Sequence, residues 1–160
     1  MTILVDSQKQ EALSLAKNQE VDNENLLLAQ KLAAKSGDWE FVYELSRTAG
    51  LETSVPIDSS GKMQIDWGSP GLVPVRPFYG AEAPFVLWVH THPSMGAYWS
   101  MTDRQSLAYS TSILKEAMVL GEPGIKVTRN SLYFDIHDKK MLSNSPSLSN
   151  WTEEEIIPWS

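Results

Sequence analysis

The 160-residue chain contains no cysteine. This absence excludes a disulfide framework and a metal site built on thiolates. Long apolar stretches are also missing, so the sequence offers no segment of membrane-spanning length. The N-terminal residues lack the basic and apolar regions of a secretory signal peptide. Together these absences favour a cytoplasmic protein that is not attached to a membrane.

Positive charge is in short supply: 13 Lys and Arg residues stand against 20 Asp and Glu residues, which gives a net charge of −7. This balance argues against nucleic acid and anionic membrane surfaces as partners. A basic partner or substrate surface fits the charge, although solubility alone explains it equally well. The hydrophobic fraction of 42% can form a core, and the length is that of one domain. We assign residues 1–142 to that domain and residues 143–160 to a polar linker and C-terminal tail.

Histidine is scarce too, and two of the three histidines are His90 and His92. They follow the apolar run 85–89, which is typical of a buried strand. Residues i and i+2 of an extended chain point to the same face, so both imidazoles can reach one metal ion. Asp103, at an expected helix start, can supply a third ligand. Two His and one carboxylate with an open fourth position are typical of catalytic zinc. The alternative, ordinary polar residues in a loop, explains the pairing less well; His137 is interpreted as such a residue.

The spacing of His90, His92, Ser100 and Asp103 resembles the signature of the JAMM (MPN+) metalloproteases. The signature covers 14 residues, and compatible surroundings extend over about residues 38–137. The resemblance implies that the two histidines and the aspartate bind zinc. It also implies that Ser100 supports the tetrahedral intermediate and that a glutamate far upstream is the general acid/base.

The position of that glutamate is the least constrained part of the resemblance, because its spacing from the histidines varies. Residues 40–45 alternate between two faces and are predicted to form the first strand of the sheet. The family places its catalytic glutamate on or next to such a strand. Glu40 is therefore the first choice, Glu44 the second because it shares the same face, and Glu52 the third. The alternative for each is a solvated carboxylate on a strand.

The remaining patterns predict an α+β fold, with a mixed sheet flanked by helices. Two N-terminal helices are expected near residues 7–18 and 22–37. The further predictions are strands at 51–57 and 63–67, a Pro/Gly-rich connection at 68–84, a helix at 103–118, and a hairpin of 125–129 with 132–136. By resemblance this is the MPN/JAB fold, which is similar to the cytidine deaminase-like arrangement.

The resemblance implies a zinc-dependent peptidase that hydrolyses a peptide or isopeptide bond at the C-terminus of ubiquitin or a ubiquitin-like protein. An activating protein partner is compatible with this expectation. Two alternatives stay open: an inactive MPN-type scaffold for protein–protein interaction, and a zinc hydrolase or metal-binding regulatory domain with another, small-molecule ligand. The complete set of His90, His92, Ser100 and Asp103 speaks against the scaffold, whereas the absence of a carboxylate from Glu40 or Glu44 near the metal would favour it. A narrow, closed pocket would favour a small-molecule substrate.

Overall fold

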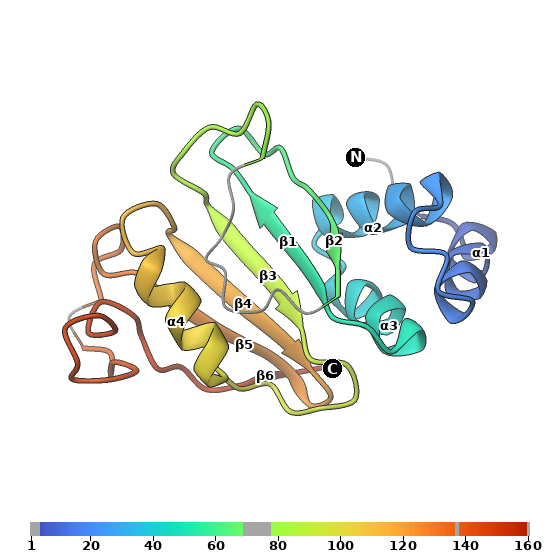
Figure 1. Cartoon of the computed structure of the whole chain (residues 1–160). Helices are drawn as coiled ribbons and strands as arrows, with labels where there is room; N and C mark the ends of the chain where they lie inside the picture. Colours follow the sequence, from blue (N-terminus) through green and yellow to red (C-terminus); the bar gives the residue numbers. More distant parts are fainter. Residues whose placement is uncertain (1–3, 69–77, 137, 160) are drawn as a thin grey trace.

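A computed structural model describes residues 4–68, 78–136 and 138–159 of the chain. These residues form an α+β architecture in which four helices pack against a mixed, six-stranded sheet (Figure 1). In chain order the elements are α1 (Asp6–Lys17), α2 (Glu24–Ser36), α3 (Trp39–Ala49), β1 (Thr53–Ile57), β2 (Asp66–Trp67), β3 (Leu87–Thr91), α4 (Met101–Tyr109), β4 (Glu116–Gly121), β5 (Gly124–Arg129) and β6 (Ile157–Pro158). The strand order is β2-β1-β3-β4-β5-β6; β3 and β4 are parallel, and the other neighbours are antiparallel.

Two hydrophobic clusters cover the two faces of this sheet. The first contains α1, α2 and α3 together with strand residues such as Val55, Val89 and Leu120. The second lies on the side of α4 and contains Trp88 and Val119 among other residues. Because side chains alternate along a strand, neighbouring residues of β3 belong to opposite clusters. Figure 1 shows the three N-terminal helices together on one side of the sheet and α4 on the other.

The prediction of a strand at residues 40–45 is wrong, because this segment lies in α3. Asp38 caps the helix: its side-chain oxygen accepts a hydrogen bond of 3.2 Å from the backbone N–H of Phe41. The buried positions Phe41, Val42 and Leu45 follow helical spacing. The apolar Val42, which had no place on the polar face of a strand, therefore belongs to the core side of a helix.

The predicted helix 103–118 is too long, and its last part is a strand. Helix α4 ends at Tyr109, whereas residues 116–121 form β4 in the middle of the sheet. Strand β4 pairs with β5 through a tight turn, in which Gly121 is opposite Gly124. The predicted hairpin of 125–129 with 132–136 is therefore wrong for its second strand. The side-chain amide of Asn130 donates to the carbonyls of Thr111 and Leu114. Its oxygen accepts from the backbone N–H of Leu132, so a turn begins at Asn130 in place of a second strand.

The other expectations for the first half of the chain hold with shifted bounds. The two N-terminal helices and the strand at 51–57 are confirmed as α1, α2 and β1. The strand at 63–67 shrinks to β2 and one isolated bridge between Met63 and Ile57. Residues 69–77 of the Pro/Gly-rich connection and His137 lie outside the described residues.

The segment beyond residue 143 ends on the sheet. Trp151 is fully buried, and its indole N–H donates to the carbonyl of Leu107 in α4 at 3.1 Å. Strand β6 then pairs with the start of β5 at the sheet edge. The C-terminal residues are thus anchored on both α4 and the strands (Figure 1).

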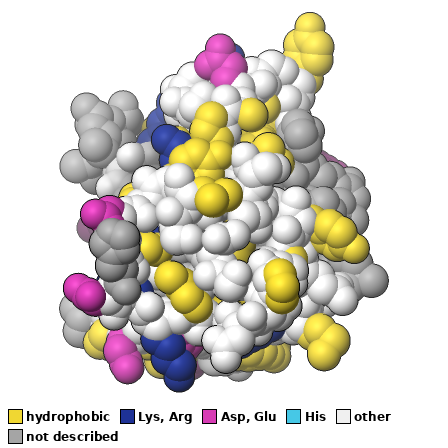
Figure 2. All heavy atoms as spheres, turned by 90° about the vertical axis from the view of Figure 1, so that its left-hand side faces the viewer, with side chains coloured by type: hydrophobic (Ala, Val, Ile, Leu, Met, Phe, Trp, Pro, Cys, Tyr) yellow, Lys and Arg dark blue, Asp and Glu magenta, His cyan; other side chains and the backbone are white. Residues whose placement is uncertain are grey.

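The left-hand side of the molecule in Figure 1 carries hydrophobic side chains that are scattered among polar ones (Figure 2). Isolated exposed apolar residues of this kind are ordinary on a protein surface. None of the helices formed by the described residues combines the length and the apolar character that crossing a membrane requires.

Candidate metal centre

Strand β3 brings two of the three predicted ligands to one end of the sheet. His90 lies in β3 and His92 follows its last residue, Thr91. Both histidines are on the α4 face, because they continue the alternation that begins with Trp88 of the second cluster. The ring of Trp88 stacks on that of His90, with centroids 4.5 Å apart. The strand and its aromatic neighbour therefore fix where the imidazole of His90 lies.

Helix α4 provides the third ligand from its first turn. Ser100 is the N-cap, and its hydroxyl oxygen accepts a hydrogen bond of 3.0 Å from the backbone N–H of Asp103. In return, Asp103 Oδ2 accepts a 2.9 Å hydrogen bond from the backbone N–H of Ser100. This reciprocal arrangement is a capping box. It orients the Asp103 carboxylate away from the helix axis and back toward the end of β3.

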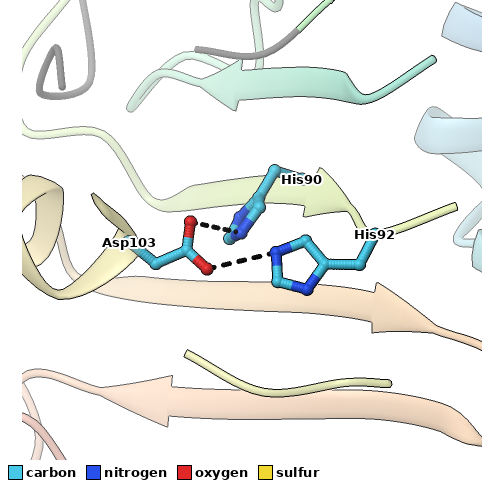
Figure 3. Close-up of side chains that lie close together, drawn as sticks. All are labelled: His90, His92 and Asp103. Atoms are coloured by element: carbon cyan, nitrogen blue, oxygen red, sulfur yellow. Dashed lines mark ion pairs between the residues drawn. The ribbon is translucent and has the colours of Figure 1, made fainter. Parts of the chain in front are cut away.

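The three side chains converge on one point, as Figure 3 shows. Asp103 Oδ1 lies 2.9 Å from His90 Nε2, and Asp103 Oδ2 lies 3.2 Å from His92 Nε2. One potential ligand atom from each residue lies within 4.8 Å of the other two. Within the part of the chain that the structure describes, this is the group of His, Asp or Glu side chains that could hold a metal ion. The structure therefore brings together all three predicted ligands.

Burial makes this group chemically unusual. The exposed fractions of His90, His92 and Asp103 are 1%, 3% and 3%. Neither ring nitrogen of His90 has a hydrogen-bond partner among the described residues, although Asp103 is close to one of them. A buried polar atom without a partner is costly. The residues present therefore fit a bound cation, for which His90 Nε2, the nitrogen that faces Asp103, would be the ligand atom.

The second nitrogen of His92 has a partner that the sequence did not identify. His92 Nδ1 lies 3.3 Å from the backbone carbonyl oxygen of Gly96, in the loop between β3 and α4. A carbonyl can only accept, so this contact favours a proton on Nδ1 and leaves the lone pair of Nε2 free for a metal. Nε2 is also the atom that faces Asp103.

The charges of the group stabilise one another. Burial raises the pKa of Asp103, but its contacts with His90 and His92 outweigh that effect and hold the pKa far below the usual range. Burial lowers the pKa of His92, but the hydrogen bond and charge of Asp103 outweigh it, and the pKa is raised. Asp103 is therefore an anion, which is the form that binds a cation.

The structure does not bring Glu40 or Glu44 to this group. Both are exposed residues of α3, and both line a surface pocket with residues of α1 such as Lys9. The strand that was expected to carry them to the metal is a helix. The order of preference among the three glutamates therefore changes.

Glu52, the third choice in the sequence, lies just before β1, the strand that pairs with the His-bearing β3. Ser54 of β1 pairs with His90 of β3 at the end of the ladder; Glu52 precedes Ser54 by two residues, as His92 follows His90. Directly opposed residues of an antiparallel pair share a face of the sheet. The charge of Glu52 also contributes to raising the pKa of His92, after the larger effects of burial, Asp103 and Gly96.

No protein-family model, curated protein or solved structure matches this chain significantly.

Proposed function

We propose that this protein is a zinc-dependent peptidase of the JAMM type with an MPN/JAB fold. The observation that carries the proposal is the buried group of His90, His92 and Asp103, whose ligand atoms converge from β3 and α4. Ser100 occupies the position in the same signature that the resemblance implies for a supporting hydroxyl. The α+β architecture with a mixed sheet is compatible with this fold.

The three side chains lie within reach of one ion. The nitrogen–oxygen distances of 2.9 and 3.2 Å join each histidine to a different oxygen of Asp103, and one ligand atom of each residue lies within 4.8 Å of the other two. Two imidazoles and one carboxylate are also ligands that zinc accepts. Three protein ligands leave a fourth position for water or substrate, as in catalytic sites.

The residues around the group have distinct roles in hydrolysis. Bound zinc supplies Lewis acidity, which polarises a carbonyl group and lowers the pKa of water to about 7. Glu52 accepts the proton of the attacking water and transfers it to the nitrogen of the leaving amine. The Ser100 hydroxyl uses a lone pair to accept from Asp103 N–H, which leaves its own proton to donate to the developing oxyanion.

The proposal assigns the acid/base role to Glu52 and not to Glu40. Glu52 is supported by the pairing of β1 with β3 and by the contribution of its charge to the raised pKa of His92. Glu40, in contrast, belongs to an exposed turn of α3 beside α1. The proposed substrate is a protein whose C-terminus is joined through a peptide or isopeptide bond, in the manner of ubiquitin or a ubiquitin-like protein. This substrate class is supported by the resemblance of the signature alone.

Metal content is the first test. Elemental analysis of the purified protein is expected to find about one zinc ion per chain, the stoichiometry of a mononuclear site. His92→Ala is expected to lose the metal, and His137→Ala serves as the control for loss of a histidine elsewhere in the chain. If neither the wild-type protein nor the control takes up zinc that is supplied, the peptidase proposal fails and the scaffold is the better account. Zinc binding would justify assays with ubiquitin-like proteins that carry a C-terminal extension.

A further inference from the structure

The loop of residues 93–97, here called the His92 loop, carries the carbonyl that faces His92. The loop rests on the turn between β4 and β5: Glu122 N–H donates to the carbonyl of Met95 at 2.7 Å. Gly121 allows this close approach, because a Cβ atom there would lie only 2.5 Å from the backbone nitrogen of Ala97. The position of the Gly96 carbonyl therefore depends on contacts outside the loop.

Tyr43 of α3 joins this turn to the His92 loop. Its hydroxyl donates to Glu122 Oε2 at 2.6 Å and accepts from the backbone N–H of Ser94 at 3.1 Å. Burial, followed by the hydrogen bond to Glu122, raises the pKa of Tyr43 to about 12, so the hydroxyl keeps its proton as a donor. Ser94 has a φ of 59°, a left-handed conformation that a serine holds only when other contacts stabilise it. The bond from Ser94 N–H to Tyr43 is such a contact.

Trp159, near the C-terminus, packs its ring against Tyr43. Its ring stacks on Tyr43, with centroids 5.8 Å apart and an interplanar angle of 28°. The indole N–H donates to the carbonyl of Gly121 at 2.9 Å, and the backbone N–H donates to the carbonyl of Pro123 at 3.2 Å. Trp159 after β6, the β4–β5 turn and Tyr43 of α3 thus contact one another next to the His92 loop.

We propose that Tyr43, Glu122 and Trp159 are positioning residues that set the metal affinity of the centre through the His92 loop. Tyr43 fixes Ser94, and the β4–β5 turn fixes Met95; both constraints place the Gly96 carbonyl against His92 Nδ1. That carbonyl keeps the proton on Nδ1, so Nε2 is available to the metal. This inference rests on the proposed metal-dependent function. It adds that Trp159, just after β6, influences the site without touching a ligand.

Four single variants of the full chain test the proposal. Tyr43→Phe removes the bridging hydroxyl but keeps the ring, and Tyr133→Phe is its control, because the Tyr133 hydroxyl bonds to Ser112 on another part of the surface. Trp159→Ala removes the stacked ring, and Ile157→Ala is its control from the adjacent strand β6, with a half-exposed side chain. Circular dichroism first verifies that each variant is folded.

Three readouts are compared: the zinc dissociation constant by chelator competition, the visible spectrum of the Co²⁺-loaded protein, and amide hydrogen exchange of residues 94–97 without metal. In Tyr43→Phe and Trp159→Ala the dissociation constant is expected to rise by about 10- to 100-fold, as for other outer partners of metal ligands. The Co²⁺ spectrum changes because it reports ligand geometry, and exchange in the loop becomes faster. The controls match the wild-type protein.

Wild-type zinc affinity and an unchanged Co²⁺ spectrum in folded Tyr43→Phe would overturn the inference, even if the variant were less stable. This result would assign Tyr43 a structural role only. If the wild-type protein binds neither Zn²⁺ nor Co²⁺, the proposed function fails separately. Amide exchange then decides whether the hydroxyl of Tyr43 holds the His92 loop. Faster exchange in Tyr43→Phe than in Tyr133→Phe supports this role, and equal exchange refutes it.

Discussion

Ser100 and Asp103 each bind the other's backbone N–H, at 3.0 and 2.9 Å, in the first turn of α4. Asp103 Oδ2, which accepts one of these hydrogen bonds, is also the atom 3.2 Å from His92 Nε2. The start of the helix and the direction of the Asp103 carboxylate, a candidate metal ligand, are therefore set by the same pair. A change at Ser100 affects both.

Ser100→Ala is expected to lose stability and metal affinity together. Loss of an N-cap hydroxyl typically lowers the free energy of unfolding by about 0.5–2 kcal/mol. The carboxylate of Asp103 also becomes less well oriented, so zinc binding weakens by about 10- to 100-fold. Asn23→Ala, which removes the cap of α2, is the matched control. It should lose comparable stability in urea titrations and keep its zinc affinity; equal effects on zinc in both variants would contradict the role of Ser100.

Glu52→Gln is expected to keep zinc and lose turnover by about 10²- to 10⁴-fold, because the amide cannot accept and return the water proton. Glu40→Gln and Glu44→Gln remove carboxylates of the same type from the exposed face of α3. These variants should retain turnover. The measurement combines metal analysis with cleavage of a ubiquitin-like protein carrying a C-terminal extension. Retained activity in Glu52→Gln, with activity lost in Glu40→Gln, would reverse the assignment.

Gln30→Leu is expected to stabilise the protein. Gln30 is completely buried in α2, and neither its amide oxygen nor its amide nitrogen has a hydrogen-bond partner among the described residues. A buried amide without partners costs about 1–3 kcal/mol in proteins, so the free energy of unfolding should rise by about that amount. Gln105→Leu, on the exposed side of α4, is the control and should change it little. A fall in the stability of Gln30→Leu would show that the amide has a partner in solution.

Asp58→Asn is expected to flatten the dependence of stability on pH in acid. Burial raises the pKa of Asp58, but hydrogen bonds from Glu82, Ser60 and Lys62 outweigh it and lower the pKa from 3.8 to about 2. The unfolded chain therefore takes up the proton first as the pH falls. The contribution of Asp58 is complete above about pH 4, the ordinary pKa of an aspartate, and is lost as the pH falls to about 2.

Urea unfolding at several pH values checks this expectation. The wild-type protein should lose stability between those limits, and Asp58→Asn should be less stable near neutral pH and lose less on acidification. Asp22→Asn removes an exposed charge and is the control. An identical slope in wild type and Asp58→Asn would show that these hydrogen bonds do not discriminate between the protonation states.

The convergence of His90, His92 and Asp103 was predictable from the sequence because it depends on local geometry. An i, i+2 pair at the end of an apolar strand and an aspartate at a helix start need only the strand and helix to form. A choice among Glu40, Glu44 and Glu52 was not possible from the sequence, because it depends on how a strand distant in sequence pairs with β3. The register of Ser54 with His90 is a property of the assembled sheet.

The two main errors in the fold have physical causes. In residues 40–45 the apolar pattern fits both a strand and a helix, and the capping contact of Asp38 decides for the helix. In residues 117–120 every side chain is buried, as expected for a strand in the middle of a sheet. Such a continuous apolar run has no period that distinguishes a strand from a helix.

The parallel pairing of β3 with β4 has a consequence for how the centre is assembled. All three ligands fall between His90 and Asp103, within the single strand–helix–strand unit formed by β3, α4 and β4. A cation bound there would link the end of β3 to the first turn of α4 and would add its binding free energy to the stability of the folded state. The N-terminal helices contribute no candidate ligand among the described residues. Metal binding would therefore stabilise one local unit of the sheet directly and the N-terminal helices only through their packing on it.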